Sequence, residues 1–358
     1  MTKINIQGKN YKLPIYLPDA TLGVIRSLGL EDLKKVEGVV VNTYHLLKNP
    51  GMEVLGKFGG IKGFMNYKGL VVSDSGGWQI FSLIYRHKRS GKITDEGVYF
   101  QENGQKKKLF TPEESIKIQF EIGSDIIVCL DDFTNPKADK KELKNSVERT
   151  ILWAQKSKIE FEKQITKRQM KQHDRPKLMA VIQGHSDKKL RKYCAEKLLE
   201  IGFDGYGYGG YPMDKKGNFD YGISEYTAQL IPDNYFKFAL GIGTPWQIVT
   251  LFTQGWEIFD CTLPTRDARH KRLYSLKRAR NSLTSLCDPE SYELINIGSS
   301  KYKKDKNPIS KSCNCTTCKK YTKAYLHHLF KINETTAYRL ASIHNVHTYN
   351  TVINSLRQ

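Results

Sequence analysis

Three aspartates stand where apolar stretches of the chain end, and their surroundings favour acid–base or nucleophilic chemistry. Asp260 follows an apolar pair, and a run rich in cationic residues comes after it, up to Arg272. Asp74 and Asp131 end two further apolar runs. Carboxylates can act as general acids, as general bases or as nucleophiles. A carboxylate beside a cationic segment therefore favours acid chemistry on a polyanion. An ordinary turn aspartate before a solvated basic loop explains the stretch around Asp260 equally well on its own.

Length and composition bound the class of protein. The chain has 358 residues, of which 39% are hydrophobic and 26% charged, as in a globular protein of one large domain or two. The formal net charge of +20 favours a polyanionic partner, although a lysine-rich proteome would give the same total. No apolar run could span a bilayer and the N-terminus does not resemble a signal peptide, so we expect a cytoplasmic protein without a membrane partner. Seven cysteines in such a chain do not indicate a disulfide framework.

Short apolar runs alternate with helical patterns, which is typical of parallel βαβ units. The predicted strands are 38–43, 70–73, 126–130, 178–182, 203–208, 236–240 and 256–259. The predicted helices are 111–122, 139–172, 187–201, 222–231 and 245–254, with one more that follows residue 45 and closes near residue 60. Short strands with turns are expected over 3–16, and an inserted, charged, β-rich segment over 80–110.

Seven or eight such units fit a closed (β/α)8 barrel, in which catalytic groups collect at the C-terminal ends of the strands. On that fold the polar residues that end the apolar runs meet in one pocket. They are Asp74, Asp131, Gln183, Gly210 and Asp260. An open doubly wound sheet is the alternative fold, but no GxGxxG motif follows a predicted strand. Asp74 and Asp131 could also be helix caps, which is a common use of aspartate after a strand.

A second cluster of reactive side chains lies near the C-terminus. It consists of Cys313, Cys315 and Cys318, followed by His327, His328, His344 and His347. Three thiolates and one imidazole complete a closed tetrahedral zinc site, which is structural rather than catalytic. Spacing alone leaves the histidine open. Residues 325–330 read as the start of a long helix, from whose far end His344 could fold back toward the thiols.

Five segments, in order and over nearly the whole chain, resemble the tRNA-guanine transglycosylases. They are DSGGWQIFSL at 74–83, FDGYGYGG at 203–210, GIGTP at 241–245, FDCTLPTRDARH at 259–270 and CNCTTCKKYTKAYLHHLF at 313–330. The resemblance implies an α/β fold: a (β/α)8 TIM barrel with insertions over 1–300, and a small zinc-binding subdomain with a C-terminal helix over 301–358. It also implies a homodimer.

The activity implied by the resemblance is that of a pentosyltransferase in queuosine biosynthesis or salvage. Such an enzyme exchanges guanine 34, at the anticodon wobble position of GUN tRNAs (those for aspartate, asparagine, histidine and tyrosine), for a 7-deazaguanine base. That base is either 7-aminomethyl-7-deazaguanine or queuine. No nucleotide cofactor is needed, because a covalent intermediate conserves the energy of the glycosidic bond.

The resemblance also implies roles for individual residues. Asp260 corresponds to the nucleophile that attacks the ribose and forms the covalent intermediate, and Asp74 to the general acid/base. The residues implied for base binding are Ser75, Gly76, Gly77, Trp78, Asp131, Gln183 and Gly210. The residues implied for RNA contact are Gly241, Gly243, Thr265, Arg266 and Arg269. For one structural Zn²⁺ per subunit, the family spacing beyond Cys318 selects His344, with His347 as its nearest competitor.

Three features depart from the family pattern near the 7-substituent end of the pocket. Trp78 stands where Phe or Tyr is usual, Phe133 stands where Cys is usual, and 211–215 reads YPMDK instead of LAVGE. These changes leave the preferred base open. Two alternative functions are a non-catalytic tRNA-binding partner subunit and a DNA-modifying deazaguanine transglycosylase. The first should have lost its catalytic carboxylates, and the intact LPTR and zinc motifs argue against the second.

Overall fold

A computed structural model describes residues 3–34, 36–85, 91–101, 108–133, 138–214, 216–277 and 283–358. Lys215, at the end of the unusual 211–215 segment, lies outside the described residues. Within the described ranges, no helix has both the length and the apolar character needed to cross a bilayer.

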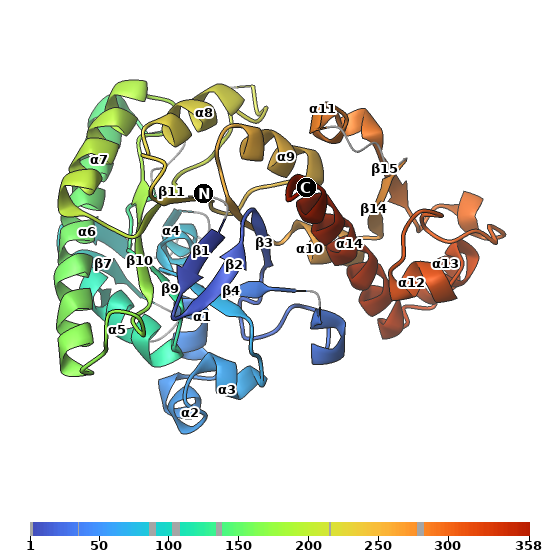
Figure 1. Ribbon diagram of the computed structural model, residues 1–358, viewed down its shortest axis with the longest axis horizontal. Coiled ribbons are helices and arrows are strands. Elements are labelled where there is room, and N and C mark those ends of the chain that lie inside the picture. The colour runs from blue at the N-terminus through green and yellow to red at the C-terminus, as the bar shows by residue number, and fades with distance from the viewer. Residues whose placement is uncertain are drawn as a thin grey trace.

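Eight parallel strands form the centre of the molecule (Figure 1). They are β3 (Ile15–Pro18), β4 (Gly38–Asn42), β5 (Leu70–Asp74), β9 (Ile126–Val128), β10 (Lys177–Ile182), β11 (Gly205–Tyr208), β12 (Phe236–Ala239) and β13 (Ile258–Cys261). Their order is β3, β13, β12, β11, β10, β9, β5, β4. A parallel bridge between Asp19 and Val40 joins the two end strands, so the barrel is nearly closed. The (β/α)8 prediction is confirmed, and the functional groups are expected at the C-terminal ends of these strands.

Helices alternate with the strands and surround the barrel (Figure 1). They are α1 (Thr43–Lys48), α2 (Met52–Lys57), α3 (Ile61–Met65), α4 (Gly77–Tyr85), α5 (Pro112–Ile122), α6 (Lys140–Lys167), α7 (Lys188–Ile201), α8 (Tyr221–Gln229), α9 (Pro245–Thr253) and α10 (Leu263–Arg269). The start of α5 follows the predicted signal: Thr111 Oγ1 accepts the Glu114 N–H at 3.1 Å, and Pro112 takes the first helical position.

Two local predictions for the barrel are wrong, and both errors involve proline. The helix predicted from residue 45 to residue 60 is interrupted after α1, because Pro50 disfavours a helical backbone at Asn49, which is extended. The segment after Asp260 is not a cationic loop but the helix α10, with Pro264 in its first turn. Its basic residues therefore project from a helix that directly follows the end of β13.

The predicted β-rich insertion is an antiparallel sheet of three strands. These are β6 (Gly91–Thr94), β7 (Gly97–Phe100) and β8 (Lys108–Phe110). The hairpin of β6 and β7 is tied to α6 at Asp95, whose carbonyl accepts the Trp153 Nε1–H at 3.1 Å and whose carboxylate accepts from Arg149 Nε at 3.3 Å. A second hairpin, β1 (Lys3–Ile6) with β2 (Lys9–Lys12), packs its apolar side chains against the barrel interior.

The C-terminal part joins a hairpin to a helical cluster. Its elements are β14 (Arg272–Leu276), α11 (Leu283–Cys287), β15 (Tyr292–Asn296), α12 (Thr316–Lys320), α13 (Lys323–Lys331) and α14 (Thr335–Leu356). The long helix predicted from residue 325 is two helices, because Asn333 is left-handed and Glu334 caps α14. The hydrophobic cluster around Cys318 includes Leu273 and Ile295, so its packing begins before residue 300. The 1–300 and 301–358 boundary stays a proposal.

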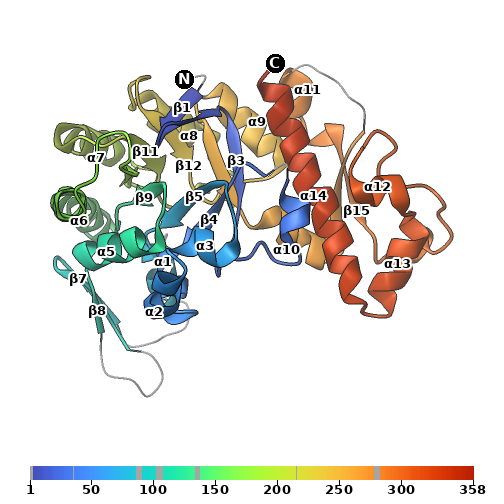
Figure 2. The ribbon, with the colours of Figure 1, turned by 60° about the horizontal axis from the view of Figure 1, so that its bottom comes forward.

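Helix α14 belongs to both parts of the molecule. It lies between the barrel and the elements α12 and α13 (Figure 2). Its buried residues Tyr349 and Ile353 join the hydrophobic core of the barrel, whereas Leu340 and Ala341 join the cluster around Cys318. Any change that loosens the C-terminal part can therefore reach the barrel through one helix.

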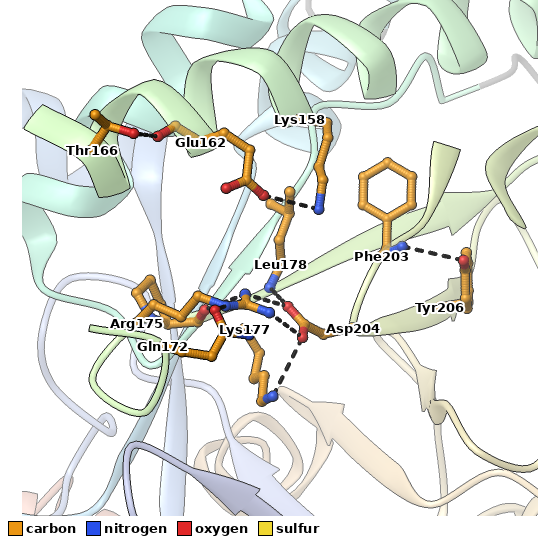
Figure 3. Close-up of polar contacts among 11 residues, drawn as sticks. Lys158, Glu162, Thr166, Gln172, Arg175, Lys177, Leu178, Phe203, Asp204 and Tyr206 are labelled. Carbon is orange, nitrogen blue, oxygen red and sulfur yellow. Dashed lines mark hydrogen bonds and ion pairs between the residues drawn. The ribbon is translucent and has the colours of Figure 1, made fainter. Parts of the chain in front are cut away.

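The N-terminal ends of β10 and β11 are held by ionic contacts on the face away from the predicted pocket. Arg175 donates from Nη1 and Nη2 to the two carboxylate oxygens of Asp204, both at 2.8 Å (Figure 3). Lys177 Nζ and the Leu178 N–H also donate to Asp204, at 3.3 and 2.8 Å. Burial alone would raise the pKa of Asp204, but these hydrogen bonds outweigh burial and lower the pKa below its usual value.

Asp204→Asn is expected to destabilise the protein by about 2 kcal/mol at pH 7, because a charged hydrogen-bond acceptor is lost from a largely buried ion pair. A carboxylate with a lowered pKa stabilises the fold above its ordinary pKa, and the contribution disappears as the pH falls through the folded-state value. Urea unfolding at neutral pH and in strong acid should therefore show a deficit that shrinks in acid. A deficit that is equal at both pH values would contradict an ionic role for Asp204.

Candidate active site

Asp260 lies at the C-terminal end of β13, next to the loop that joins β12 to α9. Its Oδ1 accepts the N–H of Gly241 at 2.7 Å, which fixes the direction of the carboxylate. The next residue, Cys261, is held from two sides: its carbonyl accepts from Tyr16 Oη at 2.9 Å, and its Sγ donates to the Gly243 carbonyl at 3.3 Å. The predicted nucleophile therefore sits on a short strand whose immediate neighbours are immobilised.

Asp74 ends β5 and is oriented by the neighbouring strand. Asn42, the last residue of β4, donates from Nδ2 to Asp74 Oδ2 at 2.8 Å. The other oxygen accepts the Gly76 N–H at a long 3.4 Å, at the start of the turn into α4. The helix-cap interpretation thus describes one weak backbone contact of Asp74, whereas side-chain hydrogen bonds from Asn42 and Gln79 also hold the carboxylate.

Asp131, Gln183 and Gly210 lie at the ends of three adjacent strands, and the structure brings them together. Gln183 Nε2 donates to Asp131 Oδ2 at 2.6 Å. Gly210 has a φ of 91°, and a Cβ there would come within 3.2 Å of Gln183 Oε1, so a larger residue would strain the backbone and crowd the amide. Helix α6 takes its cap from Asp139 and not from Asp131. The cap interpretation of Asp131 is therefore replaced by pairing with Gln183.

The carboxyl groups of the site have raised pKa values. Burial is the main cause for each, and it raises the pKa of Asp260 and of Asp131 to about 7. Burial also raises the pKa of Asp74. Nearby negative charges raise these pKa values further: Asp19 and Asp74 raise the pKa of Asp260, and Asp74 raises the pKa of Asp131. Ionisable groups with pKa values moved toward neutrality are what general acid–base chemistry requires.

The aromatic residues that are unusual for the family pattern pack together. The ring of Trp78 lies 4.5 Å from that of Phe133 and 5.6 Å from that of Tyr211, measured between centroids, and Phe133 lies 5.7 Å from Tyr211. Phe81 completes the cluster, with its ring stacked 5.6 Å from Trp78. Each ring contacts at least two of the others, so the space that one ring can occupy is set by the size of its neighbours. The unusual residues at these positions therefore pack against one another in an aromatic wall that includes Phe133, two residues after Asp131.

The remaining residues predicted for the base pocket lie together in one turn. Ser75, Gly76 and Gly77 are buried in the turn between β5 and α4. Ser75 Oγ accepts the Gly77 N–H at 3.3 Å, and its carbonyl accepts from Ser115 Oγ at 3.0 Å. The sharp turn at this point lets α4 start directly behind Asp74.

The residues predicted for RNA contact differ in accessibility. Arg266 is exposed on α10, and Gly241 is exposed beside Asp260. Arg269 is partly buried, and its Nη1 has no hydrogen-bond partner among the described residues. Thr265 and Gly243 are buried, and the Thr265 hydroxyl donates within its own turn to Thr262 O at 3.4 Å. Arg266 is therefore accessible to a ligand, whereas the Gly241 N–H is bound to Asp260 and Arg269 keeps one buried nitrogen without a partner among the described residues.

Two residues of the site were missed by sequence reasoning. Asp19 follows β3, and it went unnoticed because Ile15–Pro18 was not recognised as a barrel strand. Arg191 is fully buried on α7 and donates to the carbonyls of Ile182 at 3.0 Å and Gly209 at 2.9 Å, so it binds together the ends of β10 and β11. In the sequence Arg191 reads as one more exposed helical cation, and no local signal distinguishes it.

The C-terminal cysteines and one histidine form a compact group. The donor atoms of Cys313, Cys315, Cys318 and His344 all lie within 4.8 Å of one another. His344 Nε2 is 2.7 Å from the Tyr274 carbonyl, which can only accept, so Nε2 carries the proton and Nδ1 is free to bind a metal ion. Three sulfurs and one imidazole nitrogen at this spacing fit a tetrahedral metal site. The group could therefore hold a metal ion.

The four histidines that follow the cysteines differ in their surroundings. His344 is in the group, and His347, one turn further along α14, is not among its four donors. His327 is buried and its Nδ1 lies 2.8 Å from the Ile297 carbonyl, so it belongs to the core. His328 is exposed.

Comparison with known proteins agrees with this geometry. The family model described as queuine tRNA-ribosyltransferase matches residues 1–358. The queuine tRNA-ribosyltransferase of Thermoanaerobacter sp. (strain X514) is 36% identical, over 93% of this chain and 82% of that protein. The protein of the same name from Vibrio atlanticus (strain LGP32) is 35% identical, over 99% of this chain and 88% of that protein. The chain therefore belongs to the queuine tRNA-ribosyltransferase family.

Proposed function

We propose that this protein exchanges guanine 34 of a tRNA for a 7-deazaguanine base through a covalent bond between Asp260 and the ribose. The observation that carries the proposal is that Asp74, Asp131 and Asp260 lie at the C-terminal ends of three strands of one barrel, β5, β9 and β13, in a chain of this family. Asp74 is near enough to raise the pKa of both other carboxyl groups. A cationic helix, α10, follows Asp260 directly, where the RNA backbone would lie. Guanine 34 must leave its stack to reach such a pocket.

The two carboxylates divide the chemistry between them. The ionised Asp260 attacks C1′ of the ribose with Oδ2, the oxygen that Gly241 does not bind, and the C1′–N9 bond breaks. The electron pair of that bond leaves with guanine, and Asp74 supplies the proton that the departing base needs. Asp74 then takes a proton from the incoming base, whose ring nitrogen attacks C1′ and releases Asp260. The number of glycosidic bonds is conserved.

Recognition of the base falls to Asp131 and Gln183. Gln183 Nε2 donates a hydrogen bond to Asp131 Oδ2. The Oε1 of Gln183 is buried without a hydrogen-bond partner among the described residues. A buried acceptor without a donor costs free energy unless a ligand supplies the donor. The N1–H and the exocyclic amine of a guanine-like ring are such donors. Trp78 offers an aromatic face for stacking, as part of the wall with Phe133 and Tyr211.

The group formed by Cys313, Cys315, Cys318 and His344 is proposed to hold one structural Zn²⁺ per subunit. The donor set favours zinc, and it leaves no open position for a substrate. The partners that we propose are tRNAs with GUN anticodons, in the cytoplasm, and a second copy of the chain.

The exchange rate is expected to fall as the pH drops below about 7. Asp260, with a pKa raised to about 7, must be ionised to attack, and Asp131, also raised to about 7, must be ionised to accept from the base. Protonation of either carboxylate therefore lowers the exchange rate. The pH profile of kcat/KM should show an acidic limb near neutrality, steeper than one proton alone would give. Full activity at pH 5 would contradict this assignment.

Incorporation of labelled guanine tests the proposed function. The wild-type protein is incubated with a GUN tRNA, with the same tRNA carrying a substitution at guanine 34, and with duplex DNA. Label in the first substrate alone is the expected result, and unlabelled 7-aminomethyl-7-deazaguanine and queuine can then be compared as competitors. Label in the duplex would favour DNA modification. Binding of tRNA by a folded, zinc-loaded protein without any incorporation would favour a partner subunit.

A further inference from the structure

The carboxylate of Asp260 is oriented by a hydrogen bond from the segment 241–243, and other side chains hold that segment in place. The Gly241 N–H contacts Asp260 Oδ1 at 2.7 Å, and two residues later the Gly243 carbonyl accepts two hydrogen bonds. One comes from Cys261 Sγ at 3.3 Å, and the other from Tyr349 Oη at 3.1 Å. Tyr349 is fully buried and lies on α14, far away in the sequence.

Aromatic packing fixes the ring of Tyr349. Its centroid lies 4.9 Å from that of Tyr16 and 5.7 Å from that of Tyr274, the latter edge-on. Tyr16 also binds the Cys261 carbonyl, and Tyr274 donates its hydroxyl hydrogen to Asp267 on α10. The three tyrosines therefore surround the end of β13, and the Tyr349 hydroxyl, which also meets the Tyr274 side chain, donates to Gly243.

The helix that carries Tyr349 is anchored one turn earlier. Asn345 Nδ2 donates to the carbonyls of Pro264 and Arg272, both at 3.0 Å, and its Oδ1 accepts the Tyr274 N–H at 3.1 Å. Residues four apart lie on the same face of a helix, so Asn345 and Tyr349 meet the barrel side by side. These hydrogen bonds therefore fix the position of α14 along the barrel.

We infer that Tyr349 is a positioning residue for Asp260: its hydroxyl holds the Gly243 carbonyl, and the 241–243 segment so held aims the Gly241 N–H at the carboxylate. The inference rests on the proposed role of Asp260 as the nucleophile. It gives α14 a part in the reaction, although no residue of that helix touches the reacting atoms.

Tyr349→Phe tests the inference, because it removes one hydroxyl group and keeps the ring. The Gly241 N–H stabilises the ionised form of Asp260, so a looser contact should raise the pKa of Asp260. We expect a rise to about 8, read from the carboxyl signal of ¹³C-aspartate NMR and assigned by its absence in Asp260→Asn. In the exchange assay, kcat should fall on the order of tenfold while KM for tRNA stays the same.

Thr348→Val is the matched control. Thr348 is a buried neighbour on α14 whose hydroxyl donates to Tyr274 O at 3.3 Å and His344 O at 3.0 Å, without a hydrogen bond to the 241–243 segment. Thr348→Val should leave the pKa of Asp260 and the kcat of exchange unchanged. An Asp260 pKa that stays in place in Tyr349→Phe, or that moves equally in both variants, would overturn the inference. Absence of exchange by the wild type would refute the proposed function instead, and the NMR titration would still decide the role of Tyr349.

Discussion

Asp260→Asn is expected to lower base exchange by about 10⁴-fold or more, because an amide oxygen cannot take the place of a carboxylate nucleophile. The substitution is nearly isosteric, and the amide oxygen can still accept the Gly241 N–H. The tRNA should therefore bind as before while no covalent adduct forms. Denaturing electrophoresis of the protein after incubation with tRNA, without free base, measures the adduct directly, and exchange of labelled guanine measures turnover.

The same substitution should make the free protein more stable at alkaline pH. Burial raises the folded-state pKa of Asp260 to about 7, well above its unfolded value. The stability that comes with the protonated form is complete below the unfolded pKa and is lost as the pH rises through about 7. Asparagine resembles the protonated form at every pH. The melting temperature of Asp260→Asn relative to wild type should therefore increase between pH 5 and pH 8, which also shows that lost activity is not lost folding.

Asp19→Asn is the matched control for Asp260→Asn. Asp19 also follows a barrel strand, but its carboxylate is occupied by the N–H and the hydroxyl of Thr21, at 2.7 and 2.5 Å. Its negative charge raises the pKa of Asp260. Asp19→Asn should therefore still form the covalent adduct and move the acidic limb of the exchange reaction to lower pH. Turnover retained by Asp260→Asn would remove Asp260 as the nucleophile.

The barrel could be predicted because its signals are local. Each of the barrel strands β4, β5 and β9 to β13 is a short apolar run closed by a polar residue or glycine, and the cap at Thr111 marks the start of α5 within one residue. Strand β3 is also a short apolar run before a polar residue, but it ends at Pro18 and follows a hairpin, so in the sequence it reads as one more of the N-terminal strands. Only the pairing with β13 and the bridge to Val40 make it a barrel strand. Asp19 was missed for the same reason.

The geometry of the site depends on contacts between distant segments, which local patterns do not reveal. The side chain of Arg191 is buried because the ends of β10 and β11 present carbonyls to it, and nothing in α7 itself requires this. His344 and His347 are three residues apart and lie on the same face of α14, so only the positions of the donor atoms in the folded protein place His344 in the group. Residue type and order thus predict which chemistry the site can do, whereas tertiary packing determines the orientation of each group.

Cys315→Ser is expected to abolish zinc binding and to destabilise the C-terminal part by several kcal/mol. Structural zinc sites bind their metal with an apparent free energy on the order of 10 kcal/mol, and that energy is available only to the folded state. Cys315 is buried, and its Sγ also caps α12 by accepting the Cys318 N–H at 3.3 Å. Serine supplies a shorter and harder ligand. Metal analysis of the purified protein and hydrogen exchange over 272–331 measure the two effects.

Cys287→Ser separates loss of the metal from loss of a thiol. Cys287 is a free, half-buried cysteine of α11 that lies outside the Cys₃His group, so its variant should keep one zinc per chain and the wild-type protection pattern. In Cys315→Ser, exchange should rise first around α12 and α13 and then along α14, because His344 is anchored to both the cysteines and the Tyr274 carbonyl. A Cys315→Ser protein with full zinc content and unchanged protection would contradict the site. Loss of protection confined to α12 and α13 would show that Asn345 and Tyr349 hold α14 on the barrel without the metal.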